Sequence, residues 1–119
     1  MPDSVVIIAG GNDLDGGKTT PSEIANLVIE AGIVAKLKGA SKVFISSVLP
    51  RSSFWFQVGR HELNHLLKCQ CAANNFIFID HPNINLREHL NEYDGVHLNK
   101  EGSNLLQSNL LDFLNAVDD

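Results

Sequence analysis

Several features that would indicate a membrane, secreted or nucleic-acid-binding protein are missing from this sequence. No apolar stretch approaches the roughly 20 residues that span a bilayer, and residues 1–15 lack the basic start and small-residue cleavage site of a signal peptide. Basic residues are also scarce, nine against 14 acidic ones, and the resulting net charge of −5 disfavours binding to a phosphate backbone. We therefore expect an intracellular, cytoplasmic protein that binds neither nucleic acid nor membranes.

Cysteine is rare as well. The only two, Cys69 and Cys71, are two positions apart on a predicted helix and point to different sides, which disfavours a disulfide between them and suits a reducing compartment.

With 119 residues and 44% apolar content, the chain predicts a single domain over residues 1–119. A domain of this size buries only about two thirds of the surface of its unfolded chain, so its core is thin.

Strand and helix patterns alternate three times along the chain without a linker or repeat. Short apolar runs, rich in β-branched and aromatic residues, predict buried parallel strands at Val5–Ala9, Lys42–Val48 and Phe76–Ile79. Amphipathic segments predict helices at Pro21–Lys38, Gln57–Asn74 and Lys100–Val117. Right-handed crossovers place helices on both faces of such a sheet, so the predicted fold is an α/β three-layer sandwich around a short parallel sheet.

Two short motifs near the ends of the chain carry groups used in acyl transfer. Gly10-Gly11-Asn12-Asp13 follows the first predicted strand, and Asp94-Gly95-Val96-His97 precedes the last predicted helix. An imidazole can accept the proton of an attacking hydroxyl, and a carboxylate fixes its tautomer. Asp94 and His97 can meet in a tight turn, although a plain turn with a surface histidine explains the same letters. The alternative for Asn12 is a left-handed residue closing its turn, and both roles are compatible.

These motifs resemble the G-x-N-D and D-x-x-H blocks of the SGNH (GDSL-like) hydrolases, a family of serine esterases and acylhydrolases. The predicted elements follow in the family's order, and the chain looks most like the SGNH-like domains found near retroelements in animal sequences. The resemblance implies a truncated SGNH-hydrolase (flavodoxin-like) fold, a small ester substrate and no cofactor. It implies an oxyanion donor at Asn12, in the turn made by Gly10 and Gly11, and a general base at His97 oriented by Asp94.

The family's nucleophile block, a Gly-Asp-Ser turn on an earlier strand, has no counterpart in this sequence. The serines in or after the second predicted strand do not stand in such a setting; they are Ser46, Ser47, Ser52 and Ser53. A histidine–aspartate pair without its serine is not expected to form an acyl-enzyme. We therefore expect an inactive or weakly active esterase domain, and the alternative is a non-enzymatic association module on the same fold.

The missing block also bears on assembly. In the family's sheet the strand that carries G-x-N-D is central and has the nucleophile strand beside it, so here Val5–Ala9 is expected to present an unpaired edge. Proteins rarely leave such an edge open. The sequence therefore predicts a homodimer, or docking onto the missing upstream segment, through this strand.

A metal site is a weaker alternative. His61-Glu62-Leu63-Asn64-His65 fits the H-E-x-x-H zinc signature on a predicted helix, with His61 and His65 as ligands and Glu62 as general base. No third ligand stands at the expected spacing, although Glu88 or Glu92 could supply a downstream carboxylate. A solvated amphipathic helix explains the same letters, so we expect no metal. Asp15–Thr19 fails the spacing of a phosphate-binding loop and is expected to be a flexible polar loop.

Trp55 and two histidines lie outside the motifs described above. Trp55 is expected in the core, because large aromatic side chains are usually buried. His81 and His89 have no partner pattern in the sequence, so they are expected to be loop and surface residues.

Overall fold

A computed structural model describes the backbone of residues 4–91 and 94–118. In chain order the elements are β1 (Ser4–Ile7), α1 (Gly11–Gly16), α2 (Pro21–Leu37), β2 (Lys42–Ser46), α3 (Phe54–Asn74), β3 (Ile77–Ile79), α4 (Leu86–His89) and α5 (Lys100–Asp118). All three predicted strands and all three predicted long helices are confirmed, with ends displaced by up to three residues. Within these residues no helix is long and apolar enough to cross a membrane.

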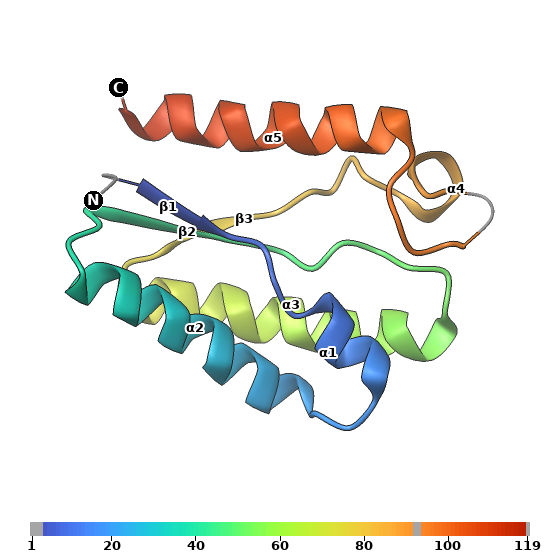
Figure 1. Ribbon diagram of the computed structural model, residues 1–119, viewed down its shortest axis with the longest axis horizontal. Coiled ribbons are helices and arrows are strands. Elements are labelled where there is room, and N and C mark those ends of the chain that lie inside the picture. Colours follow the sequence, from blue (N-terminus) through green and yellow to red (C-terminus); the bar gives the residue numbers. More distant parts are fainter. Residues whose placement is uncertain (1–3, 92–93, 119) are drawn as a thin grey trace.

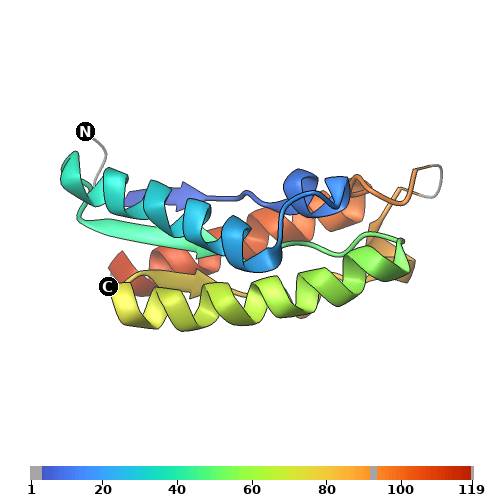
Figure 2. The same cartoon turned by 90° about the horizontal axis from the view of Figure 1, so that it is seen from below.

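The three strands form one parallel sheet in the order β1-β2-β3. Val5 pairs with Val43 on one side of β2, and Ser46 pairs with Ile79 on the other. Helices α2 and α3 pack side by side on one face of the sheet, and α5 lies across the opposite face (Figures 1 and 2). The predicted three-layer α/β arrangement is therefore confirmed.

The larger part of the core lies between the sheet and the α2–α3 layer. Val43 and Ile45 of β2 point into it and meet Leu63 and Leu67 of α3, all four being fully buried. Because side chains alternate along a strand, Phe44 and Ser46 point to the α5 face, where they are buried as well. Every residue of β1, by contrast, is only half-buried.

Local capping signals explain where the long helices begin. The Thr20 hydroxyl accepts a hydrogen bond from the backbone N–H of Glu23 (3.2 Å) and donates one to its carboxylate (3.0 Å), and Pro21 occupies the first helical position of α2. The side-chain oxygen of Asn99 accepts from the N–H of Gly102 (2.8 Å) at the start of α5. Threonine and asparagine are residue types that favour such caps, so the sequence itself specifies where both helices begin.

Two short helices, α1 and α4, were not predicted. The expected flexible loop at Asp15–Thr19 is wrong in its first two residues, because Asp15 and Gly16 end α1. Gly10 and Gly17, with φ of 104° and 70°, adopt left-handed conformations at the two ends of this helix. Gly10 and Gly17 therefore mark the two ends of one short helix.

Three assignments of individual residues need correction. Trp55 is not in the core: it lies on the first turn of α3 and is 79% exposed, while its neighbour Phe56 is 3% exposed. The sequence predicted this helix to begin at Gln57, so the inward-facing residue of its first turn, Phe56, was not recognised. His81 and His89 are not surface residues, with exposures of 5% and 3%. Both ring nitrogens of His81, and Nδ1 of His89, have hydrogen-bond partners inside the fold.

Candidate active site

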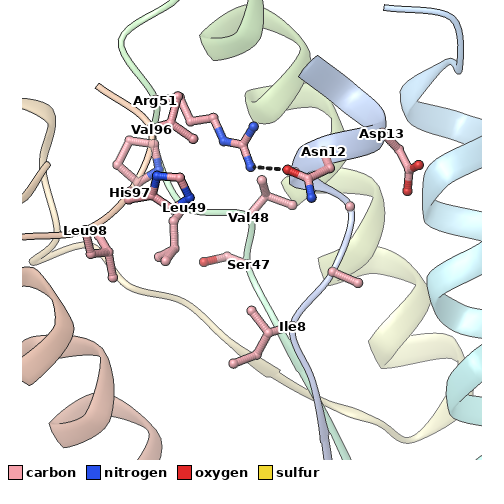
Figure 3. A pocket seen from close by; sticks show the side chains of 14 residues that line it. Ile8, Asn12, Asp13, Ser47, Val48, Leu49, Arg51, Val96, His97 and Leu98 are labelled. Carbon is pink, nitrogen blue, oxygen red and sulfur yellow. Dashed lines mark hydrogen bonds between the residues drawn. The ribbon is translucent and has the colours of Figure 1, made fainter. Parts of the chain in front are cut away.

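A pocket of about 580 Å³ opens where β1 and β2 end at the carboxyl edge of the sheet. Residues 8–13, which follow β1, line one side, residues 47–51 form the floor, and residues 96–98 close it from the loop before α5 (Figure 3). Ligands of open α/β sheets bind at this edge. The two sequence motifs, 84 residues apart at Gly10 and Asp94, therefore contribute to one concave site.

Asp94 and His97 form a hydrogen-bonded pair at the rim of this pocket. Nδ1 of His97 lies 2.7 Å from Oδ2 of Asp94, and Oδ1 of Asp94 accepts from the backbone N–H groups of Val96 (2.9 Å) and His97 (3.1 Å). The His97 hydrogen bond, followed by these two N–H groups, lowers the pKa of Asp94 to about 2. The carboxylate both closes the turn and orients the ring, so the two interpretations of the motif are compatible.

The ring orientation has a chemical consequence. Because Nδ1 donates to a carboxylate, it carries the proton of the neutral imidazole, and Nε2 keeps its lone pair. The His97 side chain is 80% exposed and lines the pocket. Nε2 is therefore available to accept a proton from a molecule bound there.

The loop that carries this pair is fastened to the rest of the fold. Gly95, with φ of 63°, accepts a hydrogen bond from the N–H of Ser52 (3.0 Å), and a Cβ at this position would collide with the Ser52 hydroxyl. Leu90 and Leu98 form an antiparallel bridge at the base of the loop. These contacts hold His97 over the end of β2.

Asn12 lies on the first turn of α1, on the opposite side of the pocket. The left-handed conformation considered for it is wrong, because Gly10 has the positive φ and Asn12 is helical. Its Oδ1 accepts a hydrogen bond from a guanidinium N–H of Arg51 (3.0 Å; Figure 3). Its Nδ2 forms no hydrogen bond within residues 4–91 and 94–118, so an amide donor is left for a ligand.

None of the four serines considered as nucleophiles hydrogen-bonds His97 in the described parts of the chain. Ser47 lines the pocket, but its neighbour Ser46 faces the other side of the sheet and bonds His81. Ser53 caps α3 through the N–H of Phe56, and Ser52 is exposed in the preceding loop. The pocket thus combines a base and an amide donor without a serine paired to that base.

The H-E-x-x-H residues lie outside the pocket. His61, Glu62 and His65 are exposed on α3, and the neighbour of His65 is Cys69, with Nε2 and Sγ 3.8 Å apart. They do not gather with a further ligand among the residues that the structure describes. Glu92 lies outside the described residues, and zinc binding by this helix stays an untested alternative.

Glu88, His89 and Glu101 place one ligand atom each within 4.8 Å of one another. Nδ1 of His89, however, accepts the backbone N–H of Asn85 (2.9 Å), so the neutral ring carries its proton on Nε2, the nitrogen that faces both carboxylates. A metal ion on Nε2 would require the proton to move to Nδ1, where it would face the N–H of Asn85. This buried histidine therefore fits a structural role better than a metal site.

Arg51 is the one pocket residue whose role the sequence reasoning missed. It is the fifth residue after the end of β2, and its guanidinium contacts Asn12 and Asp15 of α1. What could have indicated its role is its place in the sequence: it is a cationic residue shortly after the second predicted strand, at the edge where parallel sheets bind ligands. Its partners are 36 and 39 residues away in sequence, so no local pattern connects them.

No family model and no curated protein matches this chain. Solved structures do. A GDSL-like lipase from Bacteroides thetaiotaomicron is similar at 24% identity and a TM-score of 0.78, over 98% of this chain and 63% of that chain. A carbohydrate acetylesterase from Sinorhizobium meliloti is similar at 24% identity and a TM-score of 0.73, over 97% of this chain and 61% of that chain. The native aryl esterase of M. smegmatis is similar at 22% identity and a TM-score of 0.71, over 96% of this chain and 60% of that chain.

The chain thus spans about six tenths of the length of the structures that it matches. The resemblance to the retroelement-associated domains stays a prediction. At these identities the likeness establishes the fold, and it agrees with the family suggested by the two motifs. The chain has the α/β fold of the SGNH (GDSL-like) acylhydrolases and esterases.

Proposed function

We propose that this chain carries the proton-transfer and oxyanion-binding part of an ester-hydrolase site, acting on small esters. The observation that supports it is the shared pocket, which is lined both by Asn12 and by His97, whose ring is hydrogen-bonded to Asp94 at 2.7 Å. General bases and oxyanion donors are the two groups, besides a nucleophile, that acyl transfer requires.

The proposed chemistry uses water in place of a serine. A water oxygen adds to the ester carbonyl carbon while its proton passes to Nε2 of His97, and the charge that develops on the carbonyl oxygen is stabilised by the Nδ2 hydrogens of Asn12. When the intermediate collapses, the proton returns to the departing alkoxide. Asp94 stays ionised throughout and stabilises the imidazolium. Because no serine in the described parts of the chain is paired with His97, we expect slow hydrolysis limited to activated esters.

A p-nitrophenyl acetate assay tests this proposal. Exposed histidines react with this ester on their own, so the matched control for His97→Ala is His61→Ala, which removes another exposed histidine. We expect His97→Ala to remove most of the enzymatic rate and His61→Ala to leave it nearly unchanged. Equal losses in the two variants, or no rate above that of the buffer, would rule the proposal out.

The second proposed function is association through β1. Each β1 residue is half-buried, the strand pairs only with β2 among the described residues, and Ile8 just beyond it is 51% exposed. The neighbouring α2 also exposes an apolar stripe at Leu27 and Val34. Two such edges can pair antiparallel across a two-fold axis to make a homodimer, and an upstream segment of a longer chain can occupy the same edge.

Light scattering at several concentrations distinguishes this function from a purely monomeric protein. We expect dimer formation with rising concentration, together with slower hydrogen exchange of the β1 amides. The control is β3, which forms the other edge of the three-stranded sheet. A protein that stays monomeric, or one that gains protection at β3 instead, would contradict association through β1.

A further inference from the structure

Arg51 is held at the pocket by contacts from two helices. One terminal nitrogen of its guanidinium donates to Oδ2 of Asp15 (3.0 Å), and the other donates to Oδ1 of Asn12 (3.0 Å). The group also lies over the ring of Phe56 on α3, with Cζ 5.0 Å from the ring centroid. Only 16% of the side chain is exposed. We propose that Arg51 is a positioning residue that fixes the side-chain amide of Asn12 with its NH2 group toward the pocket.

The inference depends on the chemistry of the two groups. A guanidinium has donors and no acceptor, so Asn12 can meet it only with Oδ1. The Nδ2 group at the other end of the planar amide is then directed away from Arg51. If the amide turned over, its oxygen would take the place of the donor and repel the negative charge of an oxyanion. One hydrogen bond therefore decides whether Asn12 stabilises or destabilises that charge.

The cation also affects the strength of the donor. A charge-assisted hydrogen bond to the amide oxygen draws electron density from the amide and makes its N–H groups better donors. This step rests on the proposed function, in which Asn12 meets the oxyanion. The orientation of the amide is independent of it.

The surroundings of Arg51 restrict it to this position. Asp15 is one turn from Asn12 on α1, so the two acceptors present their oxygens side by side to the planar fork of the guanidinium. Gly11 leaves room for it, because a Cβ at that position would lie 2.9 Å from the nitrogen that bonds Asn12. A lysine carries its three donors on one compact nitrogen, so it lacks the planar fork that matches the two acceptors and the flat face that lies over Phe56.

Nuclear magnetic resonance tests, without any activity, how firmly Arg51 holds the amide. The side-chain NH2 signals of Asn12 are assigned by their loss in Asn12→Asp, and their heteronuclear NOE is compared in wild type, Arg51→Met and Arg87→Met. Arg87 is an exposed arginine of α4 and serves as the matched control. We expect a high NOE in wild type and in Arg87→Met, and a clear fall in Arg51→Met. A mobile amide in wild type, or no change in Arg51→Met, overturns the proposal.

Ester hydrolysis supplies the second readout. We expect Arg51→Met to lower the His97-dependent rate constant by about tenfold or more with little change in KM, since single oxyanion donors are worth about 10²- to 10³-fold in complete sites. Because both residues act through the same amide, the double variant Asn12→Asp/Arg51→Met should be no slower than Asn12→Asp alone. Additive losses would contradict positioning through Asn12.

The two readouts separate the failure of this inference from the failure of the proposed function. If wild type shows no His97-dependent hydrolysis, the proposed function fails, and the NOE alone decides whether Arg51 fixes the amide. If circular dichroism shows that Arg51→Met does not fold, Arg51→Lys replaces it. The Asn12 NOE is expected to fall in that variant too, and an unchanged value overturns the proposal.

Discussion

The hydroxyl of Ser46 lies 2.8 Å from Nε2 of His81, and both side chains are buried on the α5 side of the sheet. Ser46 donates its own proton to the carbonyl of Ser47 (2.9 Å), so it accepts from Nε2–H. Nδ1 of His81 accepts from the side-chain amide of Asn109 on α5 (2.9 Å), which also exchanges hydrogen bonds with Asn83. Both ring nitrogens are therefore satisfied when His81 is neutral, and the ring connects β2 to α5.

This geometry predicts a pH dependence of stability. Burial lowers the pKa of His81 from its ordinary value, and the charge of Asp80 opposes this only in part. The unfolded chain then binds a proton at a higher pH than the folded chain does. The stabilisation is complete above the ordinary histidine pKa and is lost as the pH falls through the lowered one. We expect urea titrations to give a smaller free energy of unfolding at about pH 5 than at about pH 7.

The variant that tests this is His81→Gln, which removes the titrating ring and keeps a donor and an acceptor. The difference in unfolding free energy between the two pH values should shrink in it. His61→Gln, on the exposed face of α3, should keep the full difference. Equal differences in wild type and His81→Gln would show that another group is responsible.

The parts of the fold that were predicted correctly are those with complete local signals. Thr20, Pro21 and Glu23 stand within four residues and define the start of α2, and the apolar runs define the strands. The Asp94–His97 pair belongs to the same class, because three residues and a left-handed glycine suffice to bring the two groups together. Local sequence therefore predicts the contact between Asp94 and His97.

The parts that were missed depend on contacts between distant segments. His81 meets Ser46 across 35 residues, and Arg51 meets Asn12 across 39. Nothing within a short window distinguishes such residues from exposed ones. Trp55 failed for a related reason: whether it or Phe56 faces inward depends on where α3 begins, which is set by the Ser53 cap.

Gly10 is expected to tolerate substitution poorly. Its φ of 104° is strained for any side chain, and a Cβ would lie 3.1 Å from Cγ2 of Ile24 on α2. We predict that Gly10→Ala lowers the free energy of unfolding by about 1–3 kcal/mol. Gly16→Ala is the control, because a Cβ there meets nothing within 4 Å, and it should be neutral or stabilising by up to about 1 kcal/mol. Denaturant titrations compare the two, and a harmless Gly10→Ala would contradict the strained geometry.

Trp55 is the only tryptophan of the chain and reports its own environment. It forms an edge-to-face pair with Phe54, at 5.3 Å between ring centroids, on the exposed side of α3. We expect fluorescence emission close to that of tryptophan in water and strong quenching by acrylamide. Trp55→Ala should change stability by no more than about 0.5 kcal/mol, whereas Phe56→Ala, at the buried neighbour, should cost about 3–5 kcal/mol. Blue-shifted emission from a dilute sample would place Trp55 in the interior and contradict this structure.

The Asp94 carboxylate is expected to control which nitrogen of His97 is protonated. In Asp94→Asn the side-chain oxygen can still accept the N–H groups of Val96 and His97, so the turn is kept. Its new NH2 group, however, faces Nδ1 of His97, which must then become an acceptor and shift its proton to Nε2. We predict that the His97-dependent rate falls to the level of His97→Ala, and that nitrogen chemical shifts of the ring report the changed tautomer.

The acidity of Asp94 sharpens the same prediction. With its pKa lowered to about 2, the carboxylate stays ionised well below the pH of any ester assay, and the stability that it contributes is lost only as the pH falls through that value. Asp112→Asn, at an exposed carboxylate of α5, is the control and should keep both the rate and its pH profile. If Asp94→Asn also kept the rate, His97 would not depend on the carboxylate, and the pair would serve only to shape the turn.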